Sequence, residues 1–288
     1  MWYFFGDDNS FASGREGPGR KDVFVFGGFY FKGPRLKEFE NRIYEIRKKY
    51  TRHPHLPIKW NFCDRAVERL YKTYRHGHLY REVLKRTDDF RLEMLGCLNE
   101  FDAETIICAW AAPHLKHGQR ASQFHGWALT NMLQRLGLEM PGHSTEKDFH
   151  ILVVLDWPGQ EFKKTYFDLY HRAYHFGRDE YNNRYTCGEL RKKGFFSQIV
   201  CGSTVHDPFL GLADIVVGAS TDFLRWCFTG QNLQRVQKFF PPVMERLRNR
   251  RGGIHRTGLI VEPKPFGDVV VRELSKFRSS LPKQRKAS

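Results

Sequence analysis

The sequence predicts an α/β protein with one mixed, five-stranded sheet and helices on its faces. Short runs rich in aromatic and β-branched residues alternate with longer segments whose apolar residues recur at helical spacing. Without one helical insertion at about 34–100, the predicted order along the chain is β-β-β-α-β-α-β-α. Such an order suits a mixed sheet covered by helices. The 288 residues, of which 41% are hydrophobic, are enough for one large core.

Two aromatic-rich strands open the chain, at 2–7 and 23–31. Ser, Gly, Pro and Arg residues at 13–20 predict a turn or hairpin loop between them. Gly27 and Gly28 lie inside the second strand, where glycines imply a bulge or close packing and not a phosphate-binding loop. These features predict a hairpin at the start of the sheet.

The helical insertion begins at Pro34, a residue type favoured in the first turn of a helix. Apolar residues then recur at helical spacing, at Leu36, Phe39, Ile43, Ile46 and Tyr50. A short strand or sheet edge is expected at 56–61, followed by helices at about 64–75 and 79–100.

The rest of the chain alternates strands and helices before a basic extension. Strands are expected at 105–111, 149–155 and 195–201, and helices at 121–137, 160–177 and 209–227. A basic helix near 231–250, a short strand near 257–262 and a polar tail complete the prediction. We assign residues 1–226 to one domain with the insertion, and residues 227–288 to a basic C-terminal extension.

Three acidic residues stand where the pattern predicts burial. Asp7 ends the first strand, Asp156 ends the most hydrophobic strand, and Asp214 lies in the predicted helix 209–227. An ionised carboxylate in apolar surroundings costs several kcal/mol unless it is paired or ligates a metal. Three such acids from distant points of one chain predict a shared divalent-metal site, with the three carboxylates on the same face of the sheet.

Each acid also has a plainer interpretation. Asp7 could cap the turn after its strand, Asp156 could start a turn before Pro158, and Asp214 could be a solvated surface acid. Period-two alternation places Asp7 and Asp8 on opposite faces unless the strand has already ended. We therefore prefer Asp7 as the ligand and keep Asp8 as a further candidate.

Other polar residues are candidates near these acids. Lys59, which lies among apolar residues, could neutralise the acid cluster or contact the scissile phosphate, or reach solvent along its alkyl chain. Ser203 and His206 could assist near the site. Asp207 stands directly before Pro208, which fits a helix N-cap followed by proline in the first turn.

The charge balance predicts a polyanionic partner. The chain carries 47 Lys and Arg against 32 Asp and Glu, a formal charge of +15, and 15% of its residues are aromatic. Such an excess favours DNA or RNA, or less often an anionic membrane, and aromatic side chains can stack on unpaired bases. Four arginines in one basic run are candidate phosphate contacts, with a solvated face as the alternative: Arg246, Arg248, Arg250 and Arg251.

The sequence also bears on the cellular compartment. No run of about 18 or more apolar residues exists, so we expect no membrane span. No basic region precedes the first apolar residues, so we expect no secretory signal. The six cysteines show no CxxC pair, which is typical of reduced thiols in a cytoplasmic protein.

The predicted element order resembles the ribonuclease H-like fold, whose first strand, fourth strand and last helix carry metal-binding acids. Asp7, Asp156 and Asp214 fall at those three places. This resemblance implies that the three acids act together at one metal site.

Three stretches also resemble motifs of the family catalogued as domain of unknown function 3800. Residues 5–10 are similar to its opening Tyr-Ile-Asp-Glu-Ser-Gly-like motif, with Asp7 and Asp8 at its two acids. Residues 58–60 resemble its middle motif. Ser203 and then residues 211–218 resemble its closing serine and Gln-Leu-Ala-Asp-like helix. The resemblance covers roughly 1–226 and implies a ribonuclease H-like nucleolytic protein, in a family with many members in phages, mobile elements and defence loci.

The chain departs from these patterns at two places. Gly211 replaces the usual Gln of the closing motif, and the predicted helix 121–137 lacks the Glu that ribonuclease H-like nucleases commonly carry there. Either Asp8 or another acid such as Glu104 completes the site, or the site binds fewer metals, or activity is weak.

The leading hypothesis is a metal-dependent nuclease acting on DNA or RNA. Two Mg²⁺ or Mn²⁺ ions about 4 Å apart would activate a water and stabilise the leaving oxygen. Asp7 would bridge them, Asp156 and Asp214 would bind one each, and Lys59 would balance charge. The alternative is a non-catalytic nucleic-acid-binding subunit of a larger nucleoprotein assembly, with a degenerate metal site. A hydrolase of free nucleotides is a weaker third hypothesis, because its substrates need no extended basic surface. A guide RNA or a protein partner is compatible with the first two.

Overall fold

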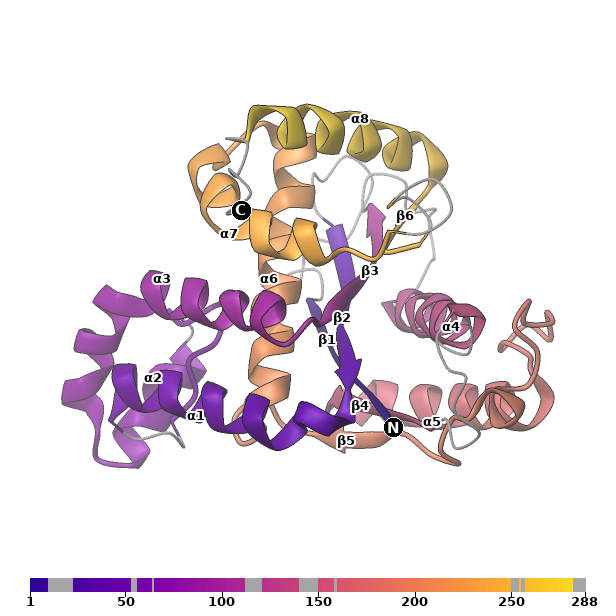
Figure 1. Cartoon of the computed structure of the whole chain (residues 1–288), viewed down its shortest axis with the longest axis horizontal. Coiled ribbons are helices and arrows are strands. Elements are labelled where there is room, and N and C mark those ends of the chain that lie inside the picture. Colours follow the sequence, from indigo (N-terminus) through magenta and orange to yellow (C-terminus); the bar gives the residue numbers. More distant parts are fainter. Residues whose placement is uncertain are drawn as a thin grey trace.

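The protein forms three layers, with a sheet between two groups of helices (Figure 1). The computed structural model describes residues 1–9, 23–52, 56–63, 65–111, 121–139, 150–157, 160–249, 254 and 257–281. All statements below concern these residues.

The central sheet is mixed and has six strands in its described part, in the order β5-β4-β1-β2-β3-β6. The strands are β1 (Trp2–Asn9), β2 (Val23–Lys32), β3 (Glu104–Ala111), β4 (Ile151–Asp156), β5 (Val200–Gly202) and β6 (Leu259–Glu262). β2 is antiparallel to both β1 and β3, whereas β4 is parallel to β1, β5 to β4 and β6 to β3. This mixed pairing confirms the predicted α/β class with a mixed sheet, and it puts the carboxyl ends of β1 and β4 side by side.

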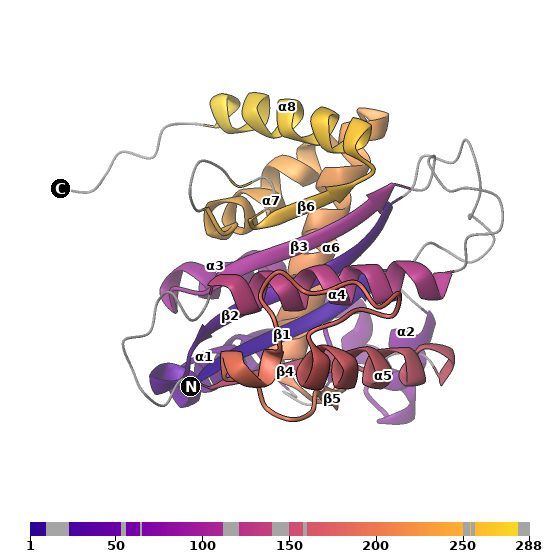
Figure 2. The same cartoon turned by 90° about the vertical axis from the view of Figure 1, so that its right-hand side faces the viewer.

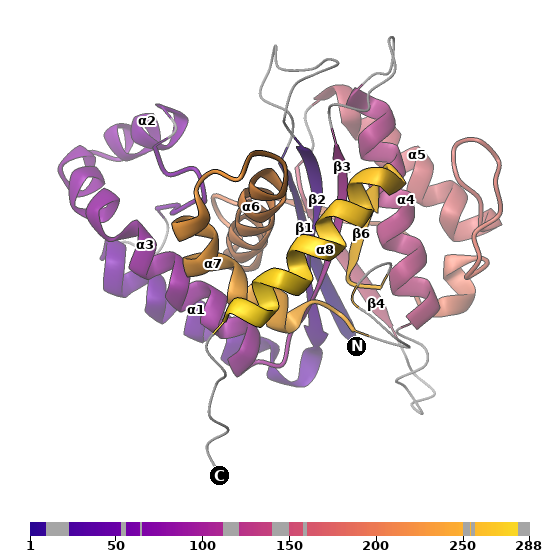
Figure 3. The ribbon, with the colours of Figure 1, turned by 90° about the horizontal axis from the view of Figure 1, so that it is seen from above.

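Two groups of helices cover the two faces. One face carries α1 (Leu36–Thr51), α2 (Arg65–Thr73), α3 (Gly77–Glu100), α6 (Pro208–Thr229) and α7 (Leu233–Arg246). α4 (Ala121–Glu139) and α5 (Gln160–Phe176) lie across the other face (Figure 2). α8 (Lys264–Ser280) packs against β6 and α6. α6 packs directly on β1 and β2, and α1 to α3 lie on its outer side (Figure 3).

Strand alternation builds a separate core on each face of the sheet. Phe5 and Val154 belong to the core shared with α6, whereas Phe4 and Val153 belong to the core shared with α4 and α5. Phe209 of α6 stacks on Phe5 with 4.6 Å between ring centroids. Because side chains alternate along a strand, the face of each following residue of β1 and β4 is fixed by these two cores.

The glycine pair in β2 reflects close packing and not a bulge. β2 keeps an uninterrupted register with β1 and β3 through Gly27 and Gly28. A Cβ at Gly28 would overlap the carbonyl oxygen of Phe5, and one at Gly27 would overlap that of Ile106. The two glycines therefore let three strands approach closely where the site begins.

The C-terminal part differs from the prediction. The predicted polar tail is wrong for 264–280, which form α8, and the predicted five strands become six because β6 extends the sheet beside β3. The predicted boundary after residue 226 falls inside α6. Periodic apolar residues in α8 explain its docking: Phe266, Val270, Leu274 and Phe277.

Two further strand predictions need correction. Residues 56–61 form a loop and turn and not a strand, because Leu56 and Ile58 turn into the core of the insertion. The predicted strand 195–201 is reduced to β5 and one isolated bridge between Phe195 and Ile151. All six cysteines are free thiols. None of the helices in the described ranges is both long enough and apolar enough to cross a membrane.

Candidate functional site

Asp7 and Asp156 lie on the same face of the sheet. β1 and β4 pair in parallel up to Gly6 and Leu155, so the next residue of each strand is an aspartate. Alternation puts Asp7 on the face of Phe5, and Asp156 on the face of Val154. Both therefore face α6, as the sequence predicts.

Asp214 approaches the same place from α6. The helix packs on β1 and β2, and the charges of Asp214 and Asp156 both act on Asp7. Asn9, two positions beyond Asp7 on β1, donates through its side-chain amide to Thr221 of α6 over 3.2 Å. The structure thus brings the three predicted acids together on one face of the sheet.

A backbone amide orients each of the three carboxylates. Asp8 N donates to Asp7 Oδ1 over 2.7 Å, Thr204 N to Asp156 Oδ1 over 2.8 Å, and Trp60 N to Asp214 Oδ2 over 2.6 Å. Hydrogen bonds among the described residues leave the second oxygen of Asp7 and of Asp214 available to a ligand. Asp7 and Asp214 are thus each held through one oxygen while the other can face a cation.

Burial and like charge raise the pKa of all three carboxyls. Burial is the largest cause for Asp7, whose pKa lies well above the ordinary value because Asp214, Asp156 and Asp8 add repulsion. Burial also raises the pKa of Asp156 and of Asp214, against the lowering effect of their amide donors and of Lys59. Carboxylates that repel one another in a buried place gain most from a bound cation.

Lys59 supplies positive charge at this cluster. Its ammonium lowers the pKa of both Asp156 and Asp214, and its side chain is half-buried. Of the predicted roles for Lys59, charge balance has direct electrostatic support.

Trp60 anchors the loop that carries Lys59. Its ring packs edge-on against Phe239 with 5.3 Å between centroids, and the guanidinium carbons of Arg235 and Arg91 lie 4.6 and 5.0 Å from its centroid. Arg91 also donates through Nη2 to the carbonyl oxygen of Trp60. Gly218 of α6 completes the anchor, because any Cβ there would overlap the indole ring. We call Trp60, Arg91, Gly218, Arg235 and Phe239 the Trp60 clamp.

The sequence analysis missed Arg91. It is 5% exposed and forms an ion pair with Asp88, with 2.9 Å between Nη1 and Oδ1. The signal was available, because Arg91 recurs at helical spacing with the buried residues Val83, Thr87, Met94 and Leu98. A charged residue at an apolar position of a helix indicates a specific buried partner, which here is the backbone of Trp60.

Asp8 and Glu104 lie on the opposite face. β1 continues to Asn9, so Asp8 remains within the strand and opposes Phe26, a residue of the core beneath α4 and α5. Glu104 accepts a hydrogen bond from Tyr30 on that same face. Neither acid therefore shares the side of the sheet on which Asp7 faces α6, although the charge of Asp8 still raises the pKa of Asp7.

The loop before α6 is built as the sequence predicts at Asp207. This residue is the N-cap, and its Oδ1 accepts from the backbone N–H groups of Phe209 and Leu210 at 2.8 and 3.0 Å. Ser203 is half-buried and accepts from backbone amides of the loop, while His206 is exposed. The loop contributes to the acids chiefly through Thr204 N, which orients Asp156.

The four arginines predicted to contact phosphate are not presented as one surface. Arg246 donates to the carbonyl oxygen of Ala103 and pairs with Asp102, with 2.6 Å between Nη2 and Oδ1. Arg248 is 1% exposed, with its guanidinium carbon 5.4 Å from the Tyr30 ring centroid, so it cannot reach a polyanion on the surface. Arg250 and Arg251 lie outside the described residues.

No three His, Cys, Asp or Glu side chains within the described ranges already lie in a metal-holding arrangement. The cluster therefore has the donor chemistry for a hard cation, three carboxylates on one face, without a closed coordination shell. Comparison of the chain with protein-family models, with curated proteins and with solved structures finds no match.

The raised pKa of Asp7 predicts how stability depends on pH in metal-free buffer. The folded protein holds this proton more tightly than the unfolded chain, so folding loses stability as pH rises from about 4 through the raised pKa of Asp7. Asp7→Asn should remove this loss and raise the free energy of unfolding at pH 7 by about 1–3 kcal/mol.

Urea melts in EDTA at pH 4.5 and pH 7 measure this effect. Asp89→Asn, at an exposed carboxylate on α3, is the matched control. It should change the free energy of unfolding by no more than about 0.5 kcal/mol at either pH. An Asp7→Asn protein less stable than the parent at pH 7 would show that Asp7 has a cationic partner in the folded state.

Proposed function

We propose that this protein is a metal-dependent nuclease that hydrolyses phosphodiester bonds of DNA or RNA. The observation that carries the proposal is the meeting of Asp7, Asp156 and Asp214 on one face of the sheet, where their charges raise the pKa of Asp7. Each acid comes from a different element and is oriented by a backbone amide. Oxygen ligands of this kind suit Mg²⁺ or Mn²⁺.

The order of elements supports a ribonuclease H-like fold within this proposal. With α1 to α3 set aside, the chain runs β-β-β-α-β-α-β-α through α6. The three acids lie on the first strand, the fourth strand and the last helix of that series, the places that the resemblance implies.

The protein's own residues have distinct roles in this proposal. Asp7, Asp156 and Asp214 would hold Mg²⁺ or Mn²⁺, with two ions when the site is fully occupied. The metal would supply Lewis-acid activation of water and of the phosphate. Lys59 limits the repulsion among the acids and offers an ammonium to a phosphate oxygen. The Trp60 clamp holds the loop that positions Lys59.

The alternative is a nucleic-acid-binding subunit without catalysis. Two observations favour it. The described side chains include no metal-holding group of three His, Cys, Asp or Glu, and Asp8 and Glu104 both lie on the other face. A site with three acids and no fourth would bind fewer ions or bind them weakly. The free thiols suit a cytoplasmic location, and the family resemblance suggests a phage, mobile-element or defence context.

Incubation of the purified protein with labelled DNA, RNA and hybrid duplexes, in Mg²⁺, Mn²⁺ or EDTA, tests the proposal. We expect cleavage of at least one substrate in Mg²⁺ or Mn²⁺ and none in EDTA. Binding without cleavage in either metal would instead support the alternative. A protein that neither binds nor cleaves any of them would overturn both.

A further inference from the structure

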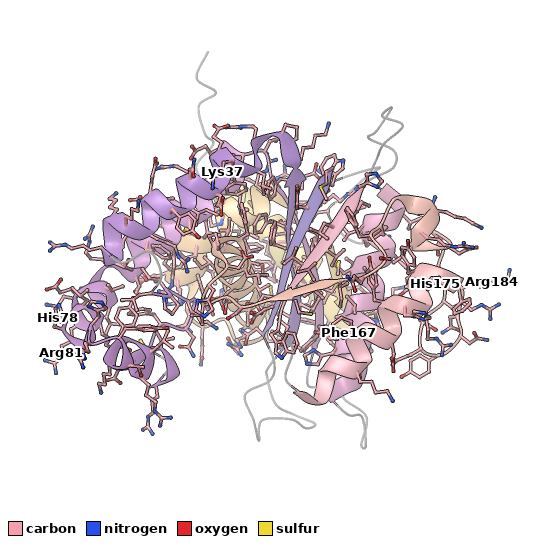
Figure 4. All side chains as sticks on the ribbon, turned by 90° about the horizontal axis from the view of Figure 1, so that it is seen from below. Lys37, His78, Arg81, Phe167, His175 and Arg184 are labelled. Atoms are coloured by element: carbon pink, nitrogen blue, oxygen red, sulfur yellow. The ribbon has the colours of Figure 1, made fainter. Side chains whose placement is uncertain are left out.

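The helical insertion carries an exposed basic surface at its tip. Residues 65–86, which span α2 and the first part of α3, contain seven Lys and Arg against two Glu. All seven basic side chains are exposed: Arg65, Arg69, Lys72, Arg75, Arg81, Lys85 and Arg86. We call this set the basic arm. In Figure 4, Arg81 and His78 lie at the outer end of the insertion, on the side opposite Arg184.

Most of the charge of the basic arm is not neutralised. Lys72 pairs with Glu68 at 2.8 Å, and the charges of Arg65 and Arg81 also lower the pKa of Glu68. Arg69, Arg75 and Lys85 form no ion pair with any described residue. Uncompensated, exposed cations on one surface create a field that attracts polyanions.

Several basic residues elsewhere in this layer are paired. Arg235 pairs with Asp222, Lys238 with Asp88 at 3.1 Å, and Lys49 with Glu93. In the basic arm, by comparison, Lys72 is the one cation of the seven that has an ion pair with a described residue.

The basic arm rests on a rigid base. Phe62, Tyr71 and Tyr80 form an aromatic cluster with ring centroids 5.0–5.7 Å apart. Tyr71 is fully buried, and Tyr80 donates to the carbonyl oxygen of Phe62 over 3.1 Å. The packing of these rings holds the helices that carry the cations, which lowers the backbone entropy lost when a partner binds.

The chain connects the basic arm directly to the acids. Lys59 and Trp60 lie in the loop between α1 and α2, and α2 begins at Arg65. β1 runs from the end marked N towards the end of the molecule at which α2 lies (Figure 3). The basic arm thus lies towards the end of the molecule at which β1 ends, and the loop of Lys59 and Trp60, whose N–H binds Asp214, leads into it along the chain.

We propose that the basic arm is the surface that holds the sugar–phosphate backbone of the nucleic acid beside the three acids. This inference rests on the proposed function and names the surface that binds its substrate. Repeated phosphates suit a set of exposed, uncompensated cations, and contacts of this kind position a nucleic acid without reading its sequence. Tyr74, which is 52% exposed on the same segment, offers a face on which an unpaired base can stack.

The test compares two triple variants that remove the same charge. The arm variant carries Arg69→Gln, Lys85→Gln and Arg75→Asn, with Asn chosen because residue 75 has a φ of 60°. The control carries Lys264→Gln, Arg272→Gln and Arg278→Gln on α8, where all three side chains are exposed. Thermal melts confirm that both fold. Fluorescence anisotropy then measures binding of labelled single-stranded and duplex DNA and RNA in EDTA, at 50 to 200 mM salt.

We expect the arm variant to bind at least one of these nucleic acids about tenfold or more weakly at 50 mM salt. The slope of log K against log salt concentration should become less steep by about two units, since each lost phosphate contact removes about 0.7–0.9 units. The control should change affinity less than about threefold. The duplex and single-stranded arms of the experiment show which form the surface holds.

Four outcomes overturn the inference. Equal losses in the two triple variants would show that only net charge matters. Competition by polyglutamate as strong as by unlabelled nucleic acid would assign the surface to an acidic protein. Absence of binding by the parent protein would remove the proposed function as well, whereas normal binding by the arm variant removes only the basic arm. EDTA prevents metal-dependent cleavage, so these binding measurements do not depend on nuclease activity.

Discussion

Asp214→Asn is expected to reduce nucleic-acid cleavage by at least about 100-fold, because it removes one of the charges that would hold the catalytic cation. A metal that contributes several kcal/mol to the transition state accounts for such a loss, at about 1.4 kcal/mol for each factor of ten. The side-chain oxygen of asparagine can still accept the N–H of Trp60. Binding of nucleic acid in EDTA should therefore stay within about twofold.

The stability of Asp214→Asn separates a metal ligand from a structural ion pair. Burial raises the pKa of Asp214, so removal of its charge in EDTA should keep or raise the melting temperature. Arg91 is the nearby buried cation, but its described hydrogen bonds go to Asp88 and to the backbone of Trp60. Breaking a true buried pair would cost about 3–5 kcal/mol in either buffer.

Asp89→Asn is again the control. Asp89 is exposed on α3 and lies outside the acid cluster and the Trp60 clamp, so its replacement should change stability by less than about 0.5 kcal/mol and leave cleavage within about threefold. Thermal melts of the parent and both variants, with EDTA and with Mg²⁺, complete the comparison. A rise in melting temperature with Mg²⁺ that the parent shows and Asp214→Asn lacks supports the site. An Asp214→Asn protein that melts far lower in both buffers would make Asp214 a structural residue.

The sequence was sufficient for the local position of each acid. Period-two alternation gives the face of Asp7 on its strand, the apolar run before Asp156 puts that residue at a strand end, and helical spacing puts Asp214 on the buried side of α6. The pairing of β4 beside β1 joins distant segments and does not follow from local rules, and it is this pairing that puts Asp7 and Asp156 side by side.

Contacts between distant segments were not available from the sequence in the same way. Gly218 and Trp60 are far apart in the chain, and no local pattern links a helix glycine to a loop tryptophan. The prediction that the basic run at 246–251 contacts phosphate does not fit Arg248, for a related reason. Arg248 follows Leu247 along the edge of β3, where its backbone N–H donates to Thr105 O, and this position buries its side chain. The net charge of a sequence predicts the sign of the partner's charge, but burial decides which basic side chains can contact that partner.

Gly218→Ala is expected to destabilise the protein by about 3 kcal/mol, because the added Cβ would overlap the indole ring of Trp60. The melting temperature should fall by roughly 6–12 °C, at about 2–4 °C for each kcal/mol in a chain of this size. Displacement of Trp60 would also move Lys59 and withdraw the N–H that orients Asp214. Cleavage should therefore fall as well, at temperatures where the variant remains folded.

Gly96→Ala is the control for the same substitution in a helix. Gly96 is exposed within α3, and a Cβ there would meet nothing within 4 Å. This variant should gain about 0.5–1 kcal/mol, since alanine is the better helix former. Opposite signs from one chemical change would locate the effect of Gly218→Ala in its contact and not in the helix backbone.

A double-mutant cycle with Trp60→Ala then identifies the contact. Trp60→Ala alone should destabilise the protein because it empties the space beside Phe239 and Arg235. With the ring removed, Gly218→Ala should add no further loss, so the two substitutions should be strongly non-additive. If their effects on the free energy of unfolding simply add, the indole ring does not rest on Gly218, and another contact must hold Lys59 beside the acids.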